Sequence, residues 1–289
     1  MPRPGPMSSG DVRVGLAQWT PGLDAAVNLQ IAVAAINELA RRGCGLVVLP
    51  ELWLCGYRSA TLREDARAAA EPLDGPVQQR LAGLAREAGL VLCAGSFPER
   101  DGGRLFNTAV IYGPAGDRLL VHRKACLYGG AEGETFTAGA AAVTAGDVAG
   151  LGRTGLCICF DGDFPETARS LRAAGAGVVL HPSAYEAGAE SWWDTIYPAQ
   201  ALCNGQWWIS ANQHGAIQGS HSGGDRMLGG SRVIAPDGRV VAAAPRHGEC
   251  VPEPELLVAD IAVGRELATA AAASGVLWSL PPRRTEETQ

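Results

Sequence analysis

The sequence predicts a single α/β domain, and three observations support this fold class. In the first part of the chain, short apolar runs alternate with segments of helical periodicity, which is typical of strands alternating with helices. Later apolar runs come in pairs separated by turn residues, which indicates hairpins. No repeat of about 20 to 50 residues and no long linker divides the 289 residues, so one domain with a sizeable core is expected.

The expected elements follow one another in this order. Strands cover residues 12–19, 46–49 and 90–94, and the helices between them cover 24–41 and 75–87. Hairpins are expected from 105–111 with 119–122 and from 231–234 with 240–243. The structured domain spans 11–266 and follows a disordered tail over 1–10 that is rich in Pro and Gly. A second tail, 267–289, is expected to wrap a neighbouring subunit.

Composition favours an acidic protein, an enzyme that acts on small molecules. The net charge is −6 with a pI near 5.4, and no run of basic residues occurs, which argues against a nucleic-acid partner. No stretch of about 18 apolar residues predicts a membrane span, and the N-terminus lacks the apolar segment of a secretory signal. The eight cysteines form no C-x-x-C pair, so we expect free thiols and a cytoplasmic location. The five histidines show no ligand spacing, and we expect neither metal nor cofactor.

Three chemically useful side chains each follow an apolar, strand-like run. Glu51 follows residues 45–50, Lys124 follows 119–123, and Cys159 lies at the end of 155–160, just before a helix-start pattern at 163–166. We expect the sulfur to face the positive end of a helix, where N–H groups and the helix dipole favour the thiolate. Cys157 alternates with Cys159 along the run, so the two face opposite sides of the sheet and only one of them can point into a site.

These residues lie in three ordered motifs: Pro50-Glu51-Leu52 with Gly56-Tyr57, His122-Arg123-Lys124, and Cys159-Phe160-Asp161 with Phe164-Pro165-Glu166. Together they resemble the nitrilase, or carbon–nitrogen hydrolase, superfamily over roughly residues 11 to 264. The resemblance implies an α-β-β-α sandwich, paired into a homodimer or a higher homo-oligomer. It also implies a small-molecule amide as the substrate.

The resemblance further implies the role of each residue. Cys159 is the nucleophile, Glu51 transfers protons, and Lys124 with the backbone N–H of Phe160 holds the oxyanion. Glu132 matches the family's second glutamate and would orient Lys124 or the substrate nitrogen. Glu134 is an alternative to Glu132, and a solvated acidic loop is the structural alternative for both.

Several other residues are candidates for the pocket, each with a structural alternative. Tyr57 belongs to the first motif. His181 ends an apolar run and either lines the site or makes structural hydrogen bonds. Asp163 either pairs with a cationic amine on the substrate or caps the next helix, and the cap is favoured. The pairs Trp192-Trp193 and Trp207-Trp208 form a pocket wall, a subunit interface or part of the core, and Trp193 is the candidate for the pocket.

The motif around the cysteine bears on the reaction. True nitrilases typically have Trp and Glu after the cysteine, whereas this chain has Phe160 and Asp161, which favours an amidase or an N-carbamoyl amine hydrolase over a nitrilase. Gly162 and Asp163 stand where relatives that bind a substrate carboxylate often have arginine. An acyltransferase using the same thioester is a further alternative. A binding protein on this scaffold is less favoured, because all three reactive residues are present.

Overall fold

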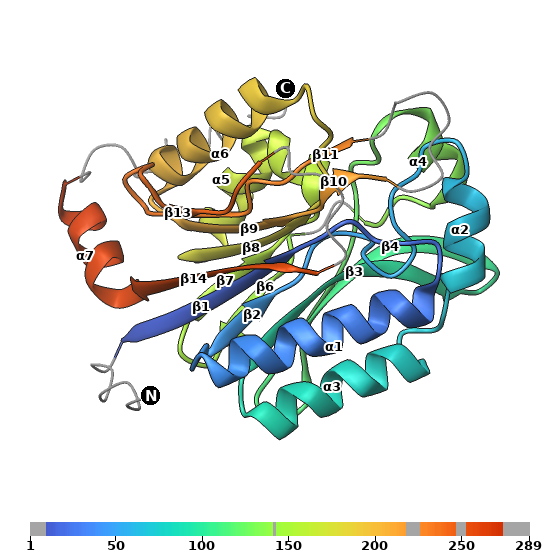
Figure 1. The fold of residues 1–289 in the computed structure, drawn as a ribbon. Helices are drawn as coiled ribbons and strands as arrows, with labels where there is room; N and C mark the ends of the chain where they lie inside the picture. Colours follow the sequence, from blue (N-terminus) through green and yellow to red (C-terminus); the bar gives the residue numbers. More distant parts are fainter. Residues whose placement is uncertain (1–9, 141–142, 218–225, 247–252, 274–289) are drawn as a thin grey trace, which may run out of the picture.

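The computed structural model describes residues 10–140, 143–217, 226–246 and 253–273. Two six-stranded sheets pack face to face and helices cover their outer faces (Figure 1), which confirms the expected α-β-β-α sandwich. Residues 1–9 of the first expected tail, residues 274–289 of the second, and Cys250 lie outside the described residues. Within the described ranges, no helix combines the length and the apolar character needed to cross a membrane.

The first sheet is built from both ends of the chain. Its strands, in spatial order, are β14 (Glu255–Ala262), β1 (Asp11–Gln18), β2 (Leu46–Val48), β3 (Val91–Asp101), β4 (Arg104–Tyr112) and β5 (Arg118–Arg123). Strands β1, β2 and β3 run parallel to one another, and β3, β4 and β5 form the antiparallel meander that contains the first predicted hairpin. Because β3 pairs with β4 along most of its length, it extends seven residues beyond the predicted end at 94, to Asp101.

The second sheet repeats this plan. Its strands, in spatial order, are β13 (Val240–Ala243), β12 (Arg232–Ile234), β9 (Trp207–Asn212), β8 (Val178–Ser183), β7 (Gly152–Leu156) and β6 (Ala145–Val148). Strands β7, β8 and β9 are parallel, and β12 with β13 forms the second predicted hairpin. A separate two-stranded sheet contains β10 (His214–Ala216) and β11 (Arg226–Leu228).

Helices enclose the two sheets. They are α1 (Ala25–Arg41), α2 (Leu62–Ala69), α3 (Pro76–Ala88), α4 (Gly129–Thr135), the 3₁₀ helix η1 (Cys159–Asp163), α5 (Pro165–Ala173), α6 (Glu190–Asn204) and α7 (Val263–Ala273). Helices α1 and α3 cover the first sheet, and α5 and α6 cover the second (Figure 1). Asp24 caps α1 by accepting from the N–H of Ala26 over 2.7 Å, and Gly89 ends α3 in the left-handed conformation.

Two boundaries differ from the sequence prediction. The apolar run that leads to Cys159 leaves the sheet at Leu156. The two residues before the cysteine, 157 and 158, do not belong to a strand. The predicted domain end at 266 falls inside α7, whose Leu267 packs against the core that lies between the sheets. The first part of the predicted tail, up to Ala273, is therefore helical.

Candidate active site

Glu51 is held at the carboxyl end of β2 by contacts from distant segments. Its backbone N–H donates to the carbonyl of Ser183 over 3.2 Å, and Gln213 donates to its carbonyl over 2.7 Å. Gly95 packs against this turn at a φ of +70°, and a Cβ there would lie 2.1 Å from the carbonyl oxygen of Pro50. The next residue, Leu52, adopts a φ of 46°, which is uncommon for a non-glycine residue. The turn is thus tightly determined by its packing.

Lys124 lies directly after β5, with its ammonium between two carboxylates. Nζ donates to Oε1 of Glu51 over 2.8 Å and to Oε1 of Glu132 over 2.7 Å, and all three side chains are buried. Burial alone would lower the pKa of Lys124, but the charges of Glu51 and Glu132 outweigh it and raise the pKa well above its usual value. The lysine is therefore a fixed cation in this site.

The loop that carries Lys124 is closed by a glycine. The N–H of Gly139 donates to the carbonyl of Lys124 over 2.8 Å, and a Cβ at Gly139 would lie 2.2 Å from the carbonyl oxygen of Arg123. No other residue can approach the backbone so closely. The loop therefore requires a glycine at position 139 for a steric reason.

Glu132 comes from α4, and its two oxygens have different partners. Oε1 accepts from Lys124, while Oε2 accepts from the N–H of Tyr128 over 2.8 Å. Burial raises the pKa of Glu132, although the charge of Lys124 opposes this. The alternative, Glu134, is exposed on the same helix. Of the two acidic residues in this loop, only Glu132 contacts Lys124.

The carboxylate of Glu51 keeps one oxygen uncommitted. Oε1 accepts from Lys124 and also from Nδ2 of Asn107 over 2.8 Å. Oε2 is buried and has no hydrogen-bond partner among the described residues. A buried acceptor without a partner costs free energy, and the charge of Glu51 raises the pKa of the Cys159 thiol, so this oxygen is the candidate base for that thiol.

Cys159 is the first residue of η1 and adopts a strained conformation with a φ of 44°. Burial, together with the charge of Glu51, raises the pKa of its thiol well above the ordinary value, and Lys124 only partly offsets this. The expectation that the site favours the thiolate is therefore wrong. The nearest α-helix, α5, begins at Pro165 rather than at the cysteine, so its dipole does not outweigh burial. The thiol needs a base to ionise it.

Asp161 joins the cysteine loop to the lysine loop. One carboxylate oxygen accepts from the N–H groups of Ala125 and Cys126 over 3.1 and 2.7 Å. The other accepts from the N–H of Ile158 over 3.1 Å and from Nε2 of His122 over 2.9 Å. These bonds fix the segment after Lys124 to the segment before Cys159. The sequence motif does not predict this role of Asp161, because three of its four partners lie 35 to 39 residues earlier in the chain.

A cavity of about 310 Å³ opens beside these residues. Cys159 and Glu132 line it, together with Phe160 and Tyr57, which the sequence singled out. Trp192, from the first of the two Trp-Trp pairs, also lines it, and two further aromatic residues line it without having been predicted, Tyr128 and Tyr185. A signal for Tyr185 existed, because it follows the carboxyl end of the parallel strand β8, where sites form in such sheets.

Two predicted pocket residues lie behind the cavity wall. Trp193 is fully buried and donates from its indole nitrogen to the carbonyl of Gly230 over 3.0 Å, so the prediction that it lines the pocket is wrong. Its neighbour Trp192 faces the cavity because successive helical residues point in different directions. His181 is also buried, and Nε2 donates to the carbonyl of Cys159 over 2.9 Å. Of its two predicted roles, the structural one fits.

Asp163 does not cap the following helix, so the favoured reading of this residue is wrong. The N-cap position of α5 is Phe164, and no side chain caps it. Instead, Oδ1 of Asp163 accepts from the hydroxyl of Tyr197 over 2.6 Å and from that of Tyr185, and the residue lines the cavity. The tyrosine hydroxyls are stronger partners in this half-buried place than the backbone groups of α5. The described residues contain no group of three His, Cys, Asp or Glu that could hold a metal ion.

Cys159 and Glu132 line the cavity, while Lys124 and Glu51 do not line it but are joined to Glu132 through the ammonium of Lys124. A cysteine, a lysine and two glutamates in this arrangement define a hydrolase with a thiol nucleophile. The sequence profile of carbon–nitrogen hydrolases matches residues 13–270, and the chain belongs to this family. It is therefore an enzyme that hydrolyses carbon–nitrogen bonds, and the resemblance stated from the three motifs is confirmed.

Relatives and solved structures agree with this assignment. A hydrolase encoded in the pqqF 5′ region of Pseudomonas protegens is 35% identical over 237 residues, which is 81% of this chain and 79% of the relative. An omega-amidase of Xenopus tropicalis is 29% identical over 239 residues, covering 80% and 84% of the two chains. The crystal structure of Nit3 from Saccharomyces cerevisiae, a member of the nitrilase superfamily, superimposes with a TM-score of 0.82 at 26% identity, covering 95% and 97%.

An amidase from Nesterenkonia sp. AN1 superimposes with a TM-score of 0.75 at 28% identity, covering 94% of this chain and 98% of that one. In that structure, the acetamide moiety of fluoroacetamide is covalently added at the active-site cysteine of a variant enzyme.

Proposed function

We propose that this enzyme is an amidase that converts small primary amides into a carboxylic acid and ammonia through a thioester on Cys159. One observation carries the proposal: Lys124 holds Oε1 of Glu51, Oε2 of that carboxylate has no partner among the described residues, and the charge of Glu51 acts on the thiol of Cys159. Two similar proteins, the omega-amidase of Xenopus tropicalis and the amidase of Nesterenkonia, support this reaction class.

Acylation begins with proton transfer from the thiol of Cys159 to Oε2 of Glu51. The sulfur attacks the amide carbonyl carbon, and the charge that develops on oxygen is stabilised by Lys124 and the backbone N–H of Phe160. Glu51 then returns the proton to the amide nitrogen. The C–N bond breaks, ammonia leaves, and a thioester remains on Cys159.

Deacylation uses the same groups in reverse. Glu51 takes a proton from a water molecule, and the hydroxide formed attacks the thioester carbonyl. The carbon–sulfur bond breaks, the carboxylic acid leaves, and the proton returns to the sulfur. The raised pKa of Lys124 keeps it protonated, so it takes no part in proton transfer. Glu51 therefore carries out the proton transfers of both half-reactions.

Ammonia release from a panel of primary amides, N-carbamoyl amines and nitriles tests the proposal. We expect turnover of amides that disappears in Cys159→Ala, and a trapped acyl adduct visible by intact mass in wild type. An adduct without ammonia-linked turnover until an amine is added would instead indicate an acyltransferase. Absence of both adduct and ammonia across the panel would contradict the amidase assignment.

We also propose that the chain forms a homo-oligomer through the outer face of α5 and α6. This face presents the exposed side chains of Leu202 and Phe164 and a groove of about 510 Å³ between the two helices. Exposed apolar surface of this kind favours association. Analytical ultracentrifugation of wild type and of Leu202→Glu would test it, and a wild-type monomer would contradict it.

A further inference from the structure

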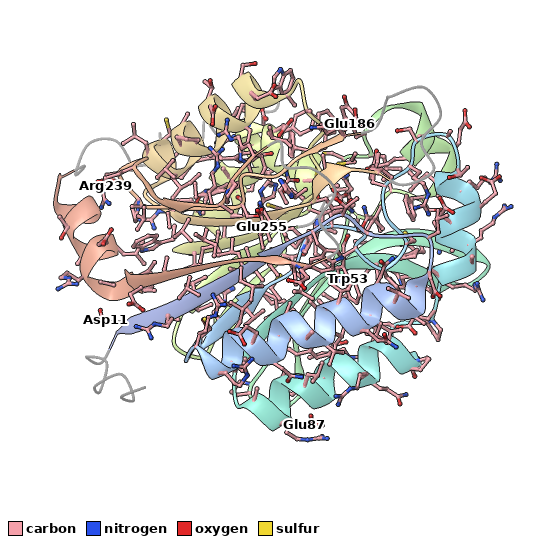
Figure 2. All side chains as sticks on the ribbon, in the orientation of Figure 1. Asp11, Trp53, Glu87, Glu186, Arg239 and Glu255 are labelled. Atoms are coloured by element: carbon pink, nitrogen blue, oxygen red, sulfur yellow. The ribbon has the colours of Figure 1, made fainter. Side chains whose placement is uncertain are left out.

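The side chains around the cavity carry an uneven distribution of charge. Three carboxylates line it, those of Glu132, Asp163 and Glu186, and Figure 2 shows Glu186 close to β11, with which it forms a bridge at Met227. None of the described residues that line the cavity is a lysine, arginine or histidine. The nearby ammonium of Lys124 is already shared between Glu51 and Glu132. Among the described residues that line the cavity, all the charged side chains are therefore acidic.

Asp163 is the carboxylate with an oxygen available to a ligand. Both of its protein hydrogen bonds, from Tyr185 and Tyr197, go to Oδ1, and among the described residues Oδ2 accepts none and no cation pairs with the group. The tyrosines fix its orientation. Burial raises the pKa of Asp163, which reflects the cost of a charged group without a counter-ion. A bound cation would offset this cost.

Aromatic rings surround the same space. The ring of Phe160 packs edge-on against Tyr128 and Phe164, with centroids 5.2 and 5.1 Å apart, so its place in the cavity wall is fixed. The indole of Trp192 lines the cavity and is 53% exposed. Faces of aromatic rings attract alkylammonium groups and accommodate methylene chains, whereas they offer nothing to a carboxylate.

We propose that the acyl chain of the substrate carries an ammonium group, which pairs with Asp163 while its amide lies at Cys159; this rests on the proposed amidase function. Both residues belong to the single five-residue helix η1. A 3₁₀ helix rises about 2 Å per residue, so their Cα atoms lie about 8 Å apart, and a spacer of about three or four methylenes fits. Amides with an anionic acyl chain are disfavoured by the same charges.

Three amides of similar length test this inference, each assayed by ammonia release. They are 4-aminobutanamide, its neutral isostere pentanamide, and the anionic succinamate. We expect wild type to prefer the cationic amide over the isostere in kcat/KM by about tenfold or more, and succinamate to be the poorest. Asp163→Asn keeps an oxygen for the tyrosine hydroxyls but loses the charge. It should lower the ratio of cationic to neutral kcat/KM by about tenfold.

Glu166→Gln is the matched control, because it removes the same charge from an exposed position three residues further on, outside the cavity. In Glu166→Gln, the ratio of cationic to neutral kcat/KM should equal that of wild type. Equal losses on both amides in Asp163→Asn, a wild type without preference for the cation, or a ratio shift in Glu166→Gln as large as in Asp163→Asn would each overturn the inference.

A binding measurement separates this inference from the proposed function. Calorimetry with Cys159→Ala compares 4-aminobutanamide with pentanamide without any turnover. If no amide releases ammonia but the cationic amide binds more tightly and loses this advantage in the Cys159→Ala, Asp163→Asn double variant, the amidase assignment fails and the cation site stands. If neutral amides are hydrolysed as well as cationic ones, the amidase stands and the cation site fails.

Discussion

The ammonium of Lys124 donates to Oε1 of Glu51 over 2.8 Å, and Oε2 of the same carboxylate has no partner among the described residues. The lysine therefore orients the glutamate and keeps its second oxygen available. The charge of Glu51 is among the causes that raise the pKa of the Cys159 thiol, which places the two groups within electrostatic reach. This arrangement supplies a base to a thiol that burial keeps protonated.

Glu51→Gln should abolish proton transfer from the thiol while preserving the shape of the side chain. We expect the rate of amide hydrolysis to fall about a thousandfold, within the range for loss of a general base. Modification of Cys159 by chloroacetamide, followed by intact mass, should slow as well. Cys157→Ser serves as a control, since that residue packs in the core and should leave alkylation at Cys159 unaffected. Undiminished alkylation in Glu51→Gln would assign the proton transfer to another group.

Lys124→Met should both inactivate and destabilise the enzyme. It removes the cation between two buried carboxylates, and breaking a buried ion pair in this way costs about 3 to 5 kcal/mol in free energy of unfolding. The loss of stability relative to wild type should become smaller as the pH falls, because protonation of Glu132 removes its repulsion with Glu51. Urea unfolding at several pH values measures it. A stability equal to wild type at neutral pH would contradict the buried ion-pair network.

Asp161→Asn should loosen the connection between the lysine and cysteine loops. Although burial opposes it, the hydrogen bond and charge of His122, with the N–H of Cys126, lower the pKa of Asp161 below its usual value. The ionised form therefore stabilises the fold above the ordinary carboxyl pKa of about 4, and this contribution is lost as the pH falls through the lower folded pKa.

The stability gap between wild type and Asp161→Asn should consequently be widest near neutrality, at about 3 kcal/mol, and close in strong acid. Urea unfolding curves from neutral to acidic pH, with kcat measured in parallel, check this. An unchanging gap would mean that the lost hydrogen bonds do not depend on the charge of Asp161.

Gly139→Ala should displace the loop that carries Lys124. The new Cβ would meet the carbonyl oxygen of Arg123 at 2.2 Å, so the backbone must shift, at a cost of about 2 to 4 kcal/mol in stability. Gly83→Ala in α3 is the control, because its nearest contact would be 3.7 Å away, at a carboxylate oxygen of Glu87. That change should be neutral or slightly stabilising in a helix. Thermal unfolding and ammonia release, measured for both variants, should show losses in Gly139→Ala and not in Gly83→Ala.

Much of the fold was accessible from local patterns. The first strand and helix were predicted to within one residue at each end, since alternating and helical periodicities are properties of short segments. The extended β3 was predicted too short, because its second half is specified by pairing with β4. Helix α7 crosses the predicted domain boundary for the same reason, as the contact of Leu267 with the core is not visible in its own sequence.

The sequence by itself determined the family and the order of Glu51, Lys124 and Cys159, because each residue follows a strand that its own neighbours specify. Only the tertiary structure decided that Asp163 faces two tyrosines rather than capping a helix, that Trp192 rather than Trp193 lines the cavity, and that burial raises the pKa of the Cys159 thiol. Tyr185 and Tyr197 lie 22 and 34 residues beyond Asp163. Hydrogen bonds and burial depend on segments that are distant in the sequence and come together only on folding. A local sequence pattern does not predict which of these segments will be in contact.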